Sequence, residues 1–501
     1  MSKPSRRPGR EEIKAQRRKK KQLEKELRDT QRSQGLTPKT HTTSSNATSP
    51  YDSVEAEREG RLDAVTGQMR IIKAQLPQLL KHLNQIPDPR NPKKLKHSLT
   101  LLMLYGLLMF VFHLSSRRQA NREMTHPQFK ENVRLLFPEL NDLPHADSLF
   151  RLLSRIDTNQ IEQTLVELIH RLIAKKTFRR YLINNCYPIA IDGTQKMPFN
   201  AIWCEQLLQR RIKKGKTADP IDGDTDTEQD KHQYYVYVLE ANLTFQNGMV
   251  IPLLSEFLEY EQGDMENNKQ DCEQRAFKRL AERLKDYFPR LPILLLLDGL
   301  YANGPIMAQC HKHRWQFMIV LKDDSLPSVW EEFDSLLKLL PNNHYSMSWG
   351  ERRQSFKWVN EIDYCYGPSG RNRMALHVAV CNEEWEEVDN NAEIIPKHSR
   401  HAWISSRPLN RNNLHERCNL GARYRWGIEA CILVEKHQGY HYEHSFALNW
   451  QAMKGYHYLM RLAHLFNTLA RFSCALAKVF KKLGVRGFIA FVYSTLTGPW
   501  L

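Results

Sequence analysis

Two apolar runs, each closed by an aspartate, constrain the fold of this chain more than any other feature. The first run, Tyr-Pro-Ile-Ala-Ile over residues 187–191, ends at Asp192, and the second, Ile-Leu-Leu-Leu-Leu over residues 293–297, ends at Asp298. Short apolar runs next to Gly or Pro are typical of buried strands. In α/β sheets the carboxyl ends of such strands open towards ligands. The two runs therefore predict an α/β domain that offers two carboxylates to a ligand.

A charged motif in the last third of the chain supplies a glutamate between two cations. Glu429 follows Arg425 by 4 residues and precedes Lys436 by 7 residues. On a helix, this spacing places the three side chains on one face. Together with the two aspartates, they make a set suited to a divalent metal and a phosphate.

This set of residues resembles the DDE transposases of bacterial insertion sequences. The signature around the family's glutamate is Tyr, two residues, Arg, three residues, Glu, six residues, Lys. The motif at Glu429 fits this spacing, but Ala422 stands at the tyrosine position. The resemblance runs from about Ile86 to the C-terminus. Residues 86–90, Ile-Pro-Asp-Pro-Arg, resemble the helical region that precedes the catalytic domain in H-repeat-type transposases.

The resemblance implies a mixed α/β fold, with an RNase H-like catalytic domain interrupted by a β-rich insertion. The order of strand-like and helical runs agrees with it, including a hairpin signal at Asn247-Gly248. In that fold the first and fourth strands lie side by side, which would bring Asp192 and Asp298 together. We expect five segments: a disordered basic tail (1–50), a helical domain that binds DNA ends (51–180), the first part of the catalytic domain (181–344), the β-rich insertion (345–414) and the C-terminal helical part of the catalytic domain (415–501).

Positive charge is concentrated at the N-terminus. The net charge of the chain is +17, and residues 1–50 hold 14 Lys and Arg against 5 Asp and Glu, a balance of +9. Such a run is usually a solvated, disordered tail. Non-specific attraction to DNA requires no folding, so the charge favours a nucleic acid partner in either case.

The cysteines and the longest apolar stretch indicate a soluble intracellular protein. Nine cysteines are scattered singly and no secretory signal opens the chain, which predicts a reducing, intracellular setting. The resemblance implies that this setting is the cytoplasm of a bacterium, in association with the nucleoid. The apolar stretch at residues 99–112 has 14 residues, too few to span a bilayer. We interpret it as a helix buried in the core and expect no membrane partner.

The activity implied by the resemblance is cleavage of the element's ends and strand transfer into target DNA. Two Mg²⁺ ions, with Mn²⁺ as a substitute, would sit about 3.5–4 Å apart and assist the attacking and leaving oxygens. Carboxylates suit such hard cations. We assign the metal ligands as Asp192, Asp298 and Glu429, and the phosphate contacts as Arg425, Lys436 and Lys196. The partners would be terminal inverted repeats and target DNA, bound by a homodimer or a larger assembly.

Each assignment also has an ordinary interpretation. An Asp after an apolar run often marks only a turn, a pair such as Arg425 and Glu429 is often a surface ion pair, and Lys196 could equally be exposed surface. Glu435 is the nearest rival to Glu429, but it lies on another helix face, and its replacement is expected to do little to the chemistry. Cysteine and histidine occur near residue 431, yet without paired cysteines a zinc site is not favoured. The alternative functions are an RNase H-like nuclease that does not transpose and a domesticated, non-catalytic DNA-binding derivative.

Overall fold

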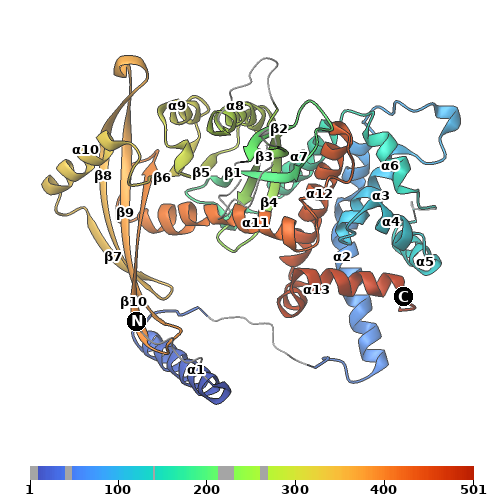
Figure 1. The fold of residues 1–501 in the computed structure, drawn as a ribbon, viewed down its shortest axis with the longest axis horizontal. Coiled ribbons are helices and arrows are strands. Elements are labelled where there is room, and N and C mark those ends of the chain that lie inside the picture. The colour runs from blue at the N-terminus through green and yellow to red at the C-terminus, as the bar shows by residue number, and fades with distance from the viewer. Residues whose placement is uncertain (1–8, 40–47, 139–141, 213–230, 260–268, 501) are drawn as a thin grey trace, which may run out of the picture. The chain divides into compact units, whose positions relative to one another are not determined.

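Figure 1 shows the structure, a computed structural model that describes residues 9–39, 48–138, 142–212, 231–259 and 269–500. The chain divides into two units. The larger unit comprises residues 44–296 and 424–501, and the smaller unit comprises residues 1–43 and 297–423.

The sheet of the larger unit is built around β1 (Tyr187–Phe199). β1 pairs antiparallel with β3 (Lys231–Thr244) and parallel with β5 (Ile293–Leu297). The first apolar run is therefore a strand between two neighbours, which explains why its residues are apolar on both faces. The predicted adjacency of the two aspartate-bearing strands is confirmed by the register that places Ala190 opposite Leu296.

Two further strands complete this sheet. β2 (Leu208–Ile212) and β4 (Val250–Phe257) both pair antiparallel with β3. The turn between β3 and β4 contains Gly248, whose φ of +81° lies in the left-handed region that glycine adopts without strain. The hairpin predicted from Asn247-Gly248 is therefore present.

Helices cover this sheet and form the region that precedes it. α8 packs on β3 and β4, α11 packs on β1, β3 and β4, and α12 packs on β4. The helices of the larger unit are α2 (Val54–Leu83), α3 (Leu99–Val111), α4 (Arg117–Met124), α5 (Pro127–Leu136), α6 (Ala146–Leu153), α7 (Asn159–Ala174), α8 (Lys269–Tyr287), α11 (Trp426–His437), α12 (Trp450–Arg471) and α13 (Ala477–Thr497).

The apolar stretch at residues 99–112 is the buried helix α3, as the sequence predicts. α3 packs against α12 and α6. At Gly106 the helices approach so closely that a Cβ would lie 2.7 Å from Leu149 and 2.8 Å from Leu459. Among the described residues, no helix is both long enough and apolar enough to cross a membrane.

The smaller unit contains a second set of paired strands. Their order is β6-β10-β9-β8-β7, and the pairs from β6 through β7 are all antiparallel. The strands are β6 (Gln316–Val320), β7 (His344–Trp349), β8 (Arg352–Tyr366), β9 (Asn372–Val388) and β10 (Ile394–Ser405), and the helices are α1 (Arg10–Ser33), α9 (Gly304–Lys312) and α10 (Pro327–Leu339). The predicted mixed α/β fold with a β-rich segment and a helical N-terminal region is thus confirmed.

The structure corrects the expectation that the N-terminal segment is disordered, because residues 10–33 form α1. This segment is rich in Glu, Lys, Arg, Gln and Leu, which favour helices. Gln16 donates to the carbonyl oxygen of Asn390 (3.1 Å), and Lys20 donates to its Oδ1 (3.0 Å). Leu27 is buried. Local propensity and these contacts within the smaller unit together outweigh the low apolar content.

Candidate active site and a buried polar network

The two aspartates follow neighbouring strands at matching positions along the chain. Ala190 on β1 lies opposite Leu296 on β5, and Asp192 and Asp298 each come two residues later. Asp192 Oδ1 accepts from Gly193 N (3.0 Å), and Asp298 Oδ1 accepts from Leu300 N (2.9 Å). Asp298 therefore also caps a turn, and both aspartates are only half-buried.

A tyrosine that the sequence did not single out as a site residue, Tyr237, lies next to Gly193 and close enough to Asp192 to feel its charge. A Cβ on Gly193 would lie 2.7 Å from the Tyr237 ring, so this close approach requires glycine. The Tyr237 hydroxyl donates to Glu273 Oε1 (2.7 Å) on α8. Burial and the charges of Glu273 and Asp192 raise the pKa of Tyr237 well above its usual value. The partner of Glu273 comes from β3, which is distant in sequence, so local spacing does not indicate the contact.

Arg425 and Glu429 form the ion pair that their spacing predicts. Arg425 Nη2 lies 2.8 Å from Glu429 Oε1, and the side chains are 7% and 34% exposed. Lys436 does not join them, because its Nζ lies 3.0 Å from Glu443 Oε1. Since Arg425 is almost fully buried, the guanidinium is better placed to orient Glu429 than to contact DNA.

The first turn of α11 lies near the beginning of β1. A Cβ on Gly427 would lie 3.3 Å from Val250 and 3.5 Å from Thr244, at the β3–β4 hairpin. In the β1–β3 register Asp192 lies opposite Glu240, which precedes Thr244 by four residues on β3. Four strand residues span about 13 Å. The turn that carries Glu429 therefore lies at the level of the start of β1, and Asp192 lies further along the strand.

Lys196 is neither exposed nor directed towards a phosphate. The residue is 3% exposed, and its Nζ donates to the Tyr442 carbonyl (2.7 Å) and lies 4.3 Å from the centre of the Tyr442 ring. His457 Nδ1 lies 3.4 Å from the same nitrogen. Burial lowers the pKa of Lys196 to about 7. A DNA contact by Lys196 is not supported by this placement, which local sequence gives no means to foresee.

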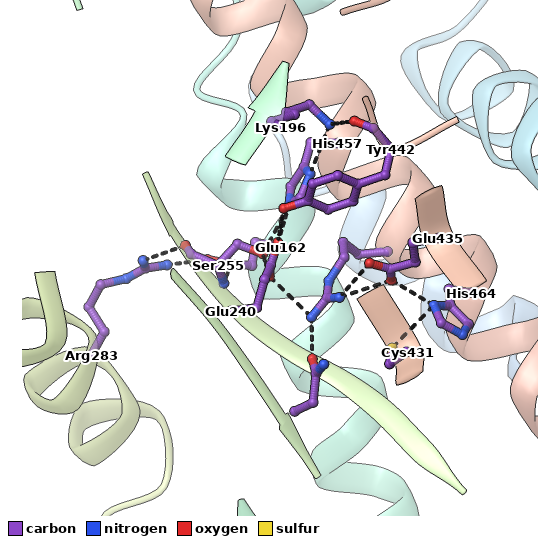
Figure 2. Close-up of polar contacts among 12 residues, drawn as sticks. Glu162, Lys196, Glu240, Ser255, Arg283, Cys431, Glu435, Tyr442, His457 and His464 are labelled. Carbon is purple, nitrogen blue, oxygen red and sulfur yellow. Dashed lines mark hydrogen bonds and ion pairs between the residues drawn. The ribbon is translucent and has the colours of Figure 1, made fainter. Parts of the chain in front are cut away.

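Glu435, the rival glutamate, is fully buried in a polar network within the larger unit (Figure 2). Arg461 Nη1 donates to both of its oxygens (2.9 and 3.2 Å), and His464 Nδ1 lies 2.6 Å from Oε1. Arg461 Nη2 also lies 3.2 Å from Glu240 Oε2. Burial alone would raise the pKa of both glutamates, but the charge of Arg461 lowers it below the usual value. Glu435 is therefore a charged anchor between α11 and α12.

The same network continues from Glu240 towards β4. Tyr442 Oη donates to Glu240 Oε1 (2.8 Å), and Ser255 Oγ donates to Oε2 (2.6 Å). Ser255 N in turn donates to Glu162 Oε1 (2.6 Å), and Glu162 pairs with Arg283 on α8 (Figure 2). Each buried charge thus has a partner of opposite charge or several hydrogen bonds, as burial of charge requires.

Three potential metal ligands meet inside this network. Possible ligand atoms of Cys431, Glu435 and His464 all lie within 4.8 Å of one another. A cation there would face the guanidinium of Arg461, which already occupies both Glu435 oxygens. Burial also raises the pKa of the Cys431 thiol well above its usual value, which disfavours the thiolate that a metal needs. We assign the three residues to the polar core.

Comparison with known families gives one match. A family model described as DDE_Tnp_1-associated matches residues 80–169, the helical region from the end of α2 into α7. No curated protein matches the chain. The match points to the DDE transposases in general and so to a transposase-related function.

Proposed function

We propose that the chain is an insertion-sequence transposase that cleaves the ends of its element and transfers them into target DNA. The observation that carries the proposal is the parallel register of β1 and β5, which leads both strands to an aspartate after the same number of residues. The spacing around Glu429 and the family match over residues 80–169 support it.

In this proposal Asp192, Asp298 and Glu429 hold two Mg²⁺ ions, or Mn²⁺ in their place. The donor set fits, because these ions prefer carboxylate oxygens and all three side chains are at least partly exposed. When bound, the ions would activate the attacking oxygen and stabilise the leaving oxygen. Arg425 orients Glu429 through their 2.8 Å contact. In this structure Asp192 and the Glu429 turn lie at different levels of β1.

The proposed partners are the terminal inverted repeats and target DNA. The net charge of +17 supports a polyanionic partner, and Lys436, partly exposed near the end of α11, remains a candidate phosphate contact. We propose a homodimer or larger assembly on DNA, since an element has two ends to be cut.

Replacement of the aspartates tests the proposal. We expect Asp192→Asn and Asp298→Asn to lower cleavage of DNA carrying the inverted repeats by about 10²-fold or more in Mg²⁺, with DNA binding retained. Asp286→Asn, an exposed aspartate on α8, is the matched control and should cleave normally.

The outcomes separate the alternative functions. Near wild-type cleavage by either site variant would overturn the assignment of metal ligands. Cleavage without strand transfer by the wild type would indicate a nuclease that does not transpose. DNA binding with no cleavage under any metal condition would indicate a non-catalytic derivative.

A further inference from the structure

A basic cavity in the larger unit lies apart from the residues proposed for catalysis. It has a volume of about 820 Å³ and is open to solvent. Three arginines of α4 line it, namely Arg117, Arg118 and Arg122, and His145 and His444 lie on its other sides. The cavity is large enough for a group the size of a phosphodiester with its ribose.

The residues that line this cavity carry more positive than negative charge. Asp147 is the one acidic residue among the described lining residues, and it pairs with Arg117 at 3.4 Å. Arg122 pairs with Glu123 at 2.8 Å, outside the lining. Arg118 is exposed and forms no ion pair within the described part of the chain. The lining therefore keeps an excess of positive charge, with Arg118 available to an anion.

The wall that carries the arginines is rigidly held. Ser116 Oγ accepts from Gln119 N (3.1 Å) and caps α4, and residues from both ends of this helix, Ser116 and Thr125, line the cavity. Asn121 Oδ1 accepts from Ala146 N (2.7 Å), which joins α4 to the start of α6. The guanidinium of Arg117 lies 4.6 Å from the centre of the Phe150 ring. A ligand would thus meet a helix that is held in place and an Arg117 side chain that is already ordered.

We propose that this cavity binds a backbone phosphate of double-stranded DNA. The identity of the anion rests on the proposed function, which makes DNA the partner. Arginine matches phosphate geometry with paired N–H donors. Contacts of this kind position a protein on DNA and do not read its sequence. The cavity would therefore set where the duplex lies on the helical region.

Binding of a short labelled duplex of mixed sequence tests the proposal. Arg118→Ala should weaken binding about tenfold and lower the slope of log affinity against log salt by about 0.9. Arg118→Lys should recover part of the loss. Arg58→Ala removes one exposed charge from α2 and should leave the slope unchanged. Because Arg118 is exposed, its replacement should also leave the melting temperature unchanged.

Three outcomes would overturn the proposal. The first is that Arg118→Ala binds the duplex as tightly as the wild type, and the second is that Arg58→Ala loses as much duplex affinity as Arg118→Ala. The third is that Arg118→Ala abolishes saturable binding of inorganic phosphate while its affinity for the duplex stays unchanged. The proposed function is judged separately by cleavage. Wild-type protein that binds DNA through Arg118 but never cleaves would refute the transposase and keep the cavity, whereas normal cleavage with no role for Arg118 would refute only the cavity.

Discussion

Lys196 shows that the surroundings of a charged residue determine its role. It follows Asp192 by four residues on β1, yet Asp192 is half-buried while the Lys196 ammonium is enclosed by Tyr442 and His457. Burial lowers its pKa, and the negative charges of Glu240 and Glu435 act in the opposite direction. The residue therefore contributes to the stability of the fold in a way that depends on pH.

We expect the free energy of unfolding to rise as pH increases from about 7 to 10.5. The folded-state pKa of Lys196 is about 7, and that of an ordinary lysine is 10.5. In this window the unfolded chain binds the proton more tightly, so raising the pH favours the folded state, by about 1 kcal/mol per pH unit for one group. Lys196→Met should remove this rise in urea denaturation series.

Lys81→Met, at an exposed position on α2, is the control for the pH series and should keep the wild-type profile. Parallel profiles for Lys196→Met and the wild type would show that Lys196 titrates as an ordinary surface lysine, in conflict with its buried position.

At the scale of elements, α11 presents its two glutamates to different surroundings. Glu429 is about one-third exposed and pairs with Arg425, whereas Glu435 is enclosed by Arg461 and His464. The pair of Arg425 and Glu429 is only partly buried, whereas Glu435 is fully buried, and removing one partner of a buried pair costs about 3–5 kcal/mol. The helix therefore separates a side chain available for chemistry from one that holds α11 on α12.

Replacing Glu435 should mainly lower stability, whereas replacing Glu429 should mainly abolish cleavage. Glu435→Ala should lower the free energy of unfolding by about 3–5 kcal/mol, because Arg461 loses a buried partner. Glu429→Ala should lower the free energy of unfolding by less than Glu435→Ala does, because Glu429 is about one-third exposed, but it should abolish cleavage. The sequence-based expectation that replacing Glu435 does little to the chemistry stays a prediction, and the buried position of Glu435 adds the expected loss of stability.

Denaturant unfolding and Mg²⁺-dependent cleavage, measured on the same preparations, check the pair. Glu435→Gln keeps hydrogen-bonding groups and should lose less stability than Glu435→Ala. Full cleavage by Glu429→Ala, combined with a folded but inactive Glu435→Gln, would transfer the catalytic assignment to Glu435.

At the scale of the whole molecule, positive charge is spread over separate segments. Residues 1–50 carry +9 of the net +17, and the described part of this segment is mostly the helix α1 and not a disordered tail. Most side chains of α1 are exposed. An ordered helix presents its many cations on a fixed surface. The cavity next to α4 offers only a few cations, at a defined position.

Deleting residues 1–50 should flatten the salt dependence of DNA binding and leave the preference for element ends intact, because the lost charges attract phosphates without reading bases. Filter binding across a salt series measures both quantities. The triple variant Arg17→Gln, Arg18→Gln, Lys21→Gln keeps α1 and should give an intermediate slope. Loss of end preference in the deletion would assign sequence recognition to this segment.

Local patterns by themselves determined several elements of this protein. Apolar runs predicted β1, β5 and the buried helix α3, Asn247-Gly248 predicted the β3–β4 hairpin, and an interval of 4 residues predicted the pair of Arg425 and Glu429. Each of these depends on neighbours within a few residues along the chain, so the sequence alone carries the information.

Only the tertiary structure decided which charged residues are enclosed. Glu435 meets Arg461 and Glu240 because α11, α12 and β3 come together, and Lys196 is buried because the chain around Tyr442 covers it. The helix α1 is joined to Asn390, more than 350 residues away along the chain. The free energy of burying a charge is set by partners distant in sequence, and no local spacing reports them.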